Sequence, residues 1–155
     1  MSSKHSAFEG IKVLDLSTRL SGAWAARLFG DFGAEILLPE TADGHFTRNC
    51  APFFDVGGVK KSLLHEYVNW NKTSTSADEV HIAALISAAD IVVTTQPSEL
   101  VELLDIQSIH LSITPHGLSG PWSSIDGNDL THSANSGWAM INKFEGEEPL
   151  QLPHN

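Results

Sequence analysis

Four short apolar runs along the chain alternate with segments whose apolar side chains recur every three or four residues. The runs are rich in β-branched residues, which predicts buried strands at 11–16, 34–38, 90–95 and 109–114. Between the first two runs, apolar residues at helical spacing precede Gly33 and predict a helix: Trp24, Ala25, Leu28, Phe29 and Phe32. A capping box, Ser76-Ala77-Asp78-Glu79, predicts the start of a second helix, and Pro97 and Ser98 that of a short one reaching Leu104.

This alternation predicts an α/β fold, a doubly wound, mainly parallel Rossmann-like sheet with flanking helices. We expect a flexible N-terminus at residues 1–9, one domain at 10–145 and a linker-like tail at 146–155. The segment 41–76 shows neither period, so we predict a long connection, of the kind that is often functional or mobile.

Composition narrows the classes of function. The 155 residues are 41% hydrophobic, enough for one domain with a core, and the formal net charge of -10 argues against binding to nucleic acid. We find neither a signal peptide nor an apolar run long enough for a membrane span, so we expect a cytoplasmic protein. The single Cys50 excludes an internal disulfide, and the eight histidines lack metal-ligand spacing, so we expect no metal.

The ends of the predicted strands carry the small and polar residues that ligands require. In doubly wound sheets, ligands gather beyond the carboxyl ends of the strands. The segments 17–22 and 115–120, with Glu40 and Thr95, follow such ends and could line one crevice. The first turn has only Gly22 where a dinucleotide fingerprint needs three spaced glycines, which disfavours a nicotinamide or flavin site.

Asp129 is the candidate for covalent chemistry. It follows a glycine-rich loop that contains Gly117 and Gly120, and it opens a predicted helix through Ser136. A carboxylate at a helix start is kept ionised by the helix dipole and can act as a nucleophile. The alternative is that Asn128 or Asp129 is only the N-cap of that helix.

Five stretches, taken in order, resemble the N-terminal part of the family III CoA-transferases, a group that includes formyl-CoA transferase and the α-methylacyl-CoA racemases. They are 10–16 with Ser21-Gly22, 32–36 ending at Glu40, 69–74, 89–93 and 112–137. The family's glycine loop matches Gly117-Leu118-Ser119-Gly120-Pro121, and its catalytic segment matches Gly127-Asn128-Asp129-Leu130.

The resemblance implies that Asp129 is the nucleophile of a CoA-transferase, which acts on an acyl-CoA and a carboxylic acid through an aspartyl acyl intermediate. The glycine-loop amides, at Gly117 and Gly120, would stabilise the oxyanion. Coenzyme A, which carries the acyl group, would be held at three places: the turn after the first predicted strand, the end of the second, and the turn at residues 71–72. The candidate ligands are Ser21, Gly22, Glu40, Arg48, Asn71 and Lys72. Arg48 and Lys72 would meet its phosphates.

The resemblance leaves alternatives open. An acyl-CoA racemase or epimerase would pair Asp129 with a histidine, either His116 or His132, and a non-catalytic CoA-binding or interaction domain would need no such carboxylate. The family's chains are more than twice this length, which implies a homodimer or a complementary C-terminal half as partner. Ala23, Leu38 and Pro39 depart from the family pattern, and the departures at Leu38 and Pro39 lie on the edge expected to face CoA.

Overall fold

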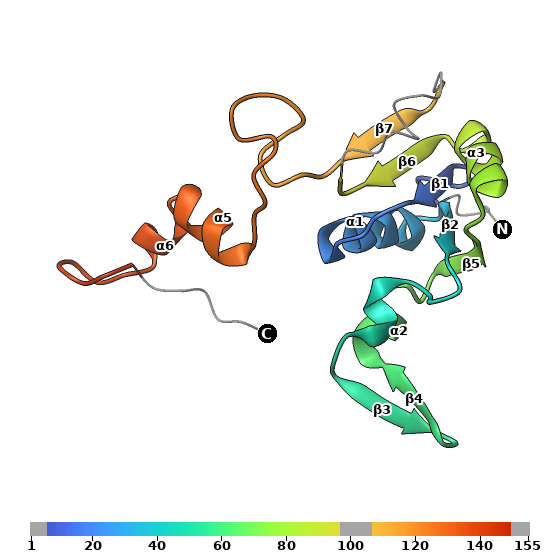
Figure 1. Ribbon diagram of the computed structural model, residues 1–155, viewed down its shortest axis with the longest axis horizontal. Helices are drawn as coiled ribbons and strands as arrows, with labels where there is room; N and C mark the ends of the chain where they lie inside the picture. Colours follow the sequence, from blue (N-terminus) through green and yellow to red (C-terminus); the bar gives the residue numbers. More distant parts are fainter. Residues whose placement is uncertain (1–5, 97–106, 150–155) are drawn as a thin grey trace, which may run out of the picture. The chain divides into compact units, whose positions relative to one another are not determined.

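The computed structural model describes residues 6–96 and 107–149 (Figure 1). They form two compact units, divided between Ile113 and Thr114, and each unit is described by itself. The helix expected at 97–104 lies outside the described residues. The single domain 10–145 and the tail 146–155 stay predictions.

Unit 1 is built on a five-stranded sheet in the order β5-β2-β1-β6-β7 (Figure 1). Every neighbouring pair of strands is parallel, so the predicted α/β fold with a parallel sheet is confirmed. Four strands coincide with the predicted runs: β1 (Lys12–Asp15), β2 (Glu35–Glu40), β6 (Ile91–Thr94) and β7 (Ile109–Ser112).

The fifth strand, β5 (Lys72–Ser76), lies in the segment predicted to be a connection. It pairs with β2 in a continuous register, from Ile36 opposite Lys72 to Glu40 opposite Ser76. Its sequence, Lys-Thr-Ser-Thr-Ser, contains no large apolar residue, because an edge strand can present polar side chains to water. Apolar runs alone therefore miss it.

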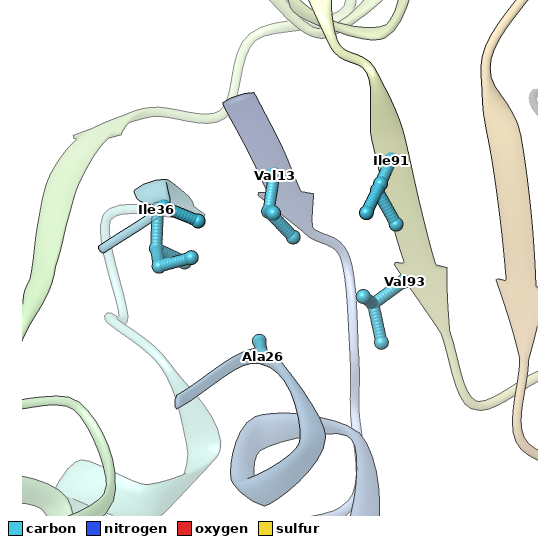
Figure 2. Close-up of a cluster of buried hydrophobic side chains, with 6 residues drawn as sticks. Val13, Ala26, Ile36, Ile91 and Val93 are labelled. Atoms are coloured by element: carbon cyan, nitrogen blue, oxygen red, sulfur yellow. The ribbon is translucent and has the colours of Figure 1, made fainter. Parts of the chain in front are cut away.

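Two helices cover opposite faces of this sheet. In β1, the neighbouring side chains of Val13 and Leu14 point to opposite faces. Val13 packs with Ala26 of α1 (Leu20–Asp31), and Figure 2 shows Ile36, Ile91 and Val93 of the sheet gathered toward the same alanine.

On the other face, Leu14 and Val92 pack with Ile86 of α3 (Glu79–Ala88). The cap of α3 differs from the predicted capping box. Asp78, not Ser76, is the N-cap, and its side chain accepts a hydrogen bond from the backbone N–H of His81. Asp at an N-cap is common, so the predicted helix start was wrong by two residues.

The segment between β2 and β5 is structured throughout. It contains the 3-10 helix η1 (Phe46–Asn49), the antiparallel strands β3 (Phe53–Val56) and β4 (Val59–Ser62), and α2 (Leu63–Val68). Gly57 and Gly58 join β3 to β4 with φ angles of 62° and 84°. A Gly-Gly pair between apolar residues is a hairpin signal, so this element was predictable from the sequence.

Unit 2 contains α5 (Asp129–Asn135) and α6 (Trp138–Ile141), preceded by the glycine loop. Among its described residues only Gly127 and Ser133 are buried. Its large apolar side chains are instead exposed: Leu118, Trp122, Ile125, Leu130, Trp138, Met140, Ile141 and Phe144. Large apolar side chains that are exposed in this number are common at interfaces.

Candidate active site

Asp129 is the first residue of α5, and its neighbour Asn128 is the N-cap. Asn128 Oδ1 accepts a hydrogen bond of 3.0 Å from the backbone N–H of Thr131, and Thr131 Oγ1 accepts one of 2.9 Å from the backbone N–H of Asn128. The capping function is thereby filled without Asp129. Within the described part of unit 2 the exposed carboxylate of Asp129 has no hydrogen-bond partner, so it is available to a ligand.

The glycine loop before α5 depends on backbone conformations that other residues avoid. Gly117 and Gly120 have φ angles of 86° and 103°, in the left-handed region. A Cβ on Gly120 would meet no atom within 4 Å, so conformation and not crowding requires this glycine. Glycine places no side chain of its own beside the amides at these two positions, as suits oxyanion stabilisation.

The two histidines considered for acid–base chemistry lie beside one another. The rings of His116 and His132 are 5.9 Å apart between centroids and nearly perpendicular, and Trp122 packs edge-on against His116 at 5.5 Å. A Cβ on the buried Gly127 would clash with the His132 ring, so this glycine makes room for it. His132 lies three residues after Asp129, one turn along α5.

In unit 1, Ser21 and Gly22 lie in the first turn of α1. The N-cap of α1, Arg19, makes no side-chain capping hydrogen bond, and no acidic residue occupies the first turn. A Cβ on Gly22 would clash with the side chains of Ser17 and Thr95, so glycine allows this turn to approach the ends of β1 and β6. The backbone N–H groups of Gly22 and Ala23 donate to the Arg19 carbonyl, each at 3.2 Å, and the dipole at a helix start favours an anion.

The structure brings Glu40 and Arg48 together in a bidentate ion pair. Arg48 Nε donates to Glu40 Oε2 and Nη2 to Oε1, each at 2.6 Å, and the backbone N–H of His45 donates to Oε2 at 2.8 Å. The hydrogen bonds from Arg48 lower the pKa of the Glu40 carboxyl from its ordinary value of 4.5 to about 2. The Glu40 side chain is 7% exposed, whereas the Arg48 side chain is 44% exposed and can reach a ligand.

Asn71 and Lys72 face α1. Asn71 Nδ2 donates to the Arg27 carbonyl at 3.1 Å and to Asp31 Oδ1 at 2.9 Å. Lys72 Nζ donates to Asp15 Oδ2 and to the Ala23 carbonyl, each at 2.7 Å. Burial lowers the pKa of the Lys72 ammonium, and Asp15 opposes that change. Both predicted ligands thus hold α1 against the sheet, and their contact with CoA stays a prediction.

Sequence reasoning missed a buried polar cluster of His45, Thr47, His65 and Asn69. Thr47 Oγ1 lies 2.7 Å from Nδ1 of both imidazoles and accepts a hydrogen bond of 3.0 Å from Asn69 Nδ2. His45 Nε2 lies 3.2 Å from the carbonyl oxygen of Ser17, in the turn after β1. No spacing signal marks these residues, because η1 and α2 are joined by the β3–β4 hairpin.

The family of this fold follows from comparison of its sequence. Residues 8–155 match the model of CoA-transferase family III. The chain belongs to CoA-transferase family III. The family resemblance expected from the five ordered stretches is therefore confirmed.

Two relatives illustrate the family match. The chain is 29% identical to the succinyl-CoA:(R)-benzylsuccinate CoA-transferase subunit BbsE of Thauera aromatica, over 96% of this chain and 40% of that protein. It is 32% identical to the succinyl-CoA:glutarate CoA-transferase of Homo sapiens, over 92% of this chain and 36% of that protein. The chain spans about 40% of the length of these family III relatives.

Solved structures agree with this assignment. A CAIB/BAIF family protein from Brucella suis superposes with a TM-score of 0.84 and 26% sequence identity, covering 96% of this chain and 44% of that one. It therefore shares the parallel α/β architecture. Within residues 6–96 and 107–149, no helix is long and apolar enough to cross a membrane, and no group of three or more His, Cys, Asp or Glu side chains could hold a metal ion.

Proposed function

We propose that this chain is the nucleophile-bearing, CoA-binding portion of an enzyme that moves CoA from an acyl-CoA to a carboxylic acid. The proposal rests on the exposure of the Asp129 carboxylate in a chain of this family. Asn128 completes the helix cap with Thr131, so the Asp129 carboxylate at the start of α5 is exposed and without a partner in the described unit.

In the proposed reaction, a carboxylate oxygen of Asp129 attacks the thioester carbonyl carbon, and the C–S bond breaks. CoA leaves as a thiolate, and a mixed anhydride remains on Asp129. The thiolate then attacks the Asp129 acyl carbon, which releases the donor acid and forms an aspartyl-CoA thioester. An acceptor carboxylate attacks that thioester, which expels the CoA thiolate and leaves a second mixed anhydride on Asp129. The thiolate then attacks the acceptor's acyl carbon, which forms the acceptor's CoA thioester and frees the Asp129 carboxylate.

The glycine loop is proposed to stabilise the oxyanion that forms at each attack. Its amides at Gly117 and Gly120 are proposed for this role because both positions are glycines with a left-handed backbone and have no side chain of their own. Preorganised backbone donors lower the barrier without rearranging during the reaction.

For CoA itself, the proposed ligands are the first turn of α1, at Ser21 and Gly22, and the exposed guanidinium of Arg48. Glu40 is proposed to orient Arg48, to which it is joined by two hydrogen bonds. Asn71 and Lys72 are proposed to act on the same site by holding α1 in place, with direct phosphate contact as the alternative. The names of the two relatives above make succinyl-CoA the first donor to assay.

A second candidate function is an acyl-CoA racemase or epimerase. It is favoured by the position of His132 one turn from Asp129 on α5, with His116 packed against it, so that either histidine is a candidate to pair with Asp129 as acid and base. A third is a CoA-binding or interaction domain without catalysis. In each case we propose a cytoplasmic protein, and as partner a second copy or a polypeptide that supplies the rest of the family fold.

The test is covalent capture. The chain is incubated with succinyl-CoA and then hydroxylamine, and the mass of the peptide containing Asp129 is measured. A hydroxamate on Asp129 is expected, and Asp129→Asn should abolish it, whereas the matched control Glu145→Gln, an exposed carboxylate in the same unit, should retain it. Exchange of the α-proton in deuterated water without hydroxamate would instead favour the racemase.

Calorimetric titration with acetyl-CoA, alongside the mass in solution, is the matching binding test. Binding with no capture at Asp129 would favour the non-catalytic domain. A folded chain that neither binds nor is captured would contradict the proposal for this chain.

A further inference from the structure

The hydroxyl of Thr47 lies where three separate segments of unit 1 meet. Thr47 belongs to η1, His65 lies in α2 with Asn69 as that helix's C-cap, and His45 reaches the Ser17 carbonyl beyond β1. Thr47 is 0% exposed, and His45, His65 and Asn69 are buried as well. Their polar atoms therefore bond mainly to one another, and among the described residues Asn69 Oδ1 has no hydrogen-bond partner.

The Ser17 carbonyl fixes the direction of the hydrogen bonds in this cluster. A carbonyl oxygen only accepts, so His45 Nε2 must carry the hydrogen that it donates to Ser17. In a neutral imidazole the other nitrogen, Nδ1, is then an acceptor. Thr47 must donate its one hydroxyl hydrogen to His45 Nδ1, across 2.7 Å.

The same logic fixes the second imidazole. Once Thr47 has donated its hydrogen, the 2.7 Å contact with His65 requires His65 Nδ1 to be the donor. Asn69 Nδ2 lies 3.0 Å from the hydroxyl and 3.1 Å from His65 Nδ1. Because His65 Nδ1 carries its own hydrogen, Nδ2 donates to the hydroxyl, so Thr47 donates once and accepts twice, which is its full capacity. The chain of donors runs from His65 to Thr47, to His45 and to Ser17.

The surroundings keep both imidazoles neutral. Burial lowers the pKa of His45, which faces Asp15 of β1, Glu40 of β2 and Lys72 of β5. Burial also lowers the pKa of His65, which faces Arg48, Glu40, His45 and Glu66. Each carboxylate near these rings has a nearby cation: Lys72 for Asp15, Arg48 for Glu40 and Lys61 for Glu66.

We propose that Thr47 is a positioning residue of the candidate CoA site, whose hydroxyl fixes Arg48 relative to the turn that leads into α1. Arg48 is the next residue in η1, and Ser17 begins the turn whose end carries Ser21 and Gly22. The inference rests on the proposed function for the identity of the ligand. In this proposal Thr47 does not touch CoA but sets the distance between Arg48 and the first turn of α1, the two proposed CoA ligands.

The test measures the tautomers of His45 and His65 and the affinity of the chain for acetyl-CoA. At pH 8, ¹⁵N spectra of the wild-type chain should show His45 protonated at Nε2 and His65 at Nδ1. Thr47→Val keeps the shape but removes the hydroxyl, so acetyl-CoA affinity measured by calorimetry should fall about tenfold, the effect of one or two lost hydrogen bonds. Thr47→Ser restores the hydroxyl and should restore affinity to within about threefold of wild type.

The outcomes separate the two proposals. Both imidazoles in the same tautomer, or equal affinity of wild type and a folded Thr47→Val, would overturn the positioning role even if acetyl-CoA binds. If Thr47→Val does not fold, the wild-type tautomers and the Thr47→Ser affinity decide. The expected tautomers in a folded chain that does not bind acetyl-CoA would support the hydrogen-bond chain and overturn both the proposed function and the positioning role.

Discussion

Lys72 Nζ lies 2.7 Å from Asp15 Oδ2, and both side chains are 0% exposed. The two residues are 57 positions apart and come from β5 and β1, strands that are not neighbours in the sheet. Lys72 Nζ also donates to the Ala23 carbonyl in α1, so one ammonium joins two strands and a helix.

Removing this ammonium should destabilise the fold. Lys72→Met leaves the Asp15 carboxylate buried without its partner, which typically costs roughly 3–5 kcal/mol of unfolding free energy. Urea denaturation followed by circular dichroism would measure the loss. The control Lys61→Met removes an exposed lysine 3.8 Å from Glu66, and such surface pairs contribute about 0–1 kcal/mol. Equal midpoints for the two variants would contradict the structural role of Lys72.

The Glu40–Arg48 pair should make stability depend on acidic pH. The pKa of Glu40 falls from 4.5 to about 2 in the folded chain, so the unfolded state binds more protons between these values. The contribution of Glu40 is therefore complete above pH 4.5 and is lost as pH falls toward about 2. Glu40→Gln should show a shallower loss of unfolding free energy over this range in urea titrations at several pH values. If the unfolding free energy of wild type and Glu40→Gln changed equally with pH, the pair would not control the acid dependence of stability.

Gly22 should tolerate no side chain. Ala has a higher helix propensity than Gly by about 1 kcal/mol, so Gly22→Ala would stabilise an isolated helix. Here the Cβ would clash with Ser17 and Thr95, and overpacking of this kind costs about 1–3 kcal/mol. Thermal unfolding should show a lower Tm for Gly22→Ala and little change for the exposed neighbour Ser21→Ala. A Tm of Gly22→Ala above that of wild type would contradict the close approach.

The elements that the sequence predicted are those whose stability comes from large apolar side chains. The runs around Val13, Ile36 and Val92 become central strands, and the spacing of Ala25 to Phe32 becomes α1. β5 was not predicted because its residues are polar, and a strand at the edge of the sheet can have that composition. The pair Gly57-Gly58 is itself a hairpin signal, but hydrophobic periodicity does not register a turn of two glycines.

In the candidate site, too, some features could be predicted from the sequence and others could not. Local chemistry marked Asp129 and the glycine loop, but two neighbouring residues, Asn128 and Asp129, both suit an N-cap, and only the structure shows which one fills it. The partners of Lys72 and Thr47 could not be predicted, because each is brought close by strand pairing or helix packing over many residues. The family resemblance made Lys72 a candidate phosphate ligand, and the structure adds that its ammonium donates to Asp15 and to the Ala23 carbonyl.

The ion pair between Arg48 and Glu40 also affects how an anionic ligand reaches the protein. Because the guanidinium is already neutralised by two hydrogen bonds from a carboxylate, the pair presents little net positive field to solvent. The chain as a whole carries a formal net charge of -10, so a phosphate-bearing molecule gains no long-range attraction on approach. Capture of CoA would then proceed at an unsteered association rate, and its affinity would come from slow dissociation once short-range hydrogen bonds have formed.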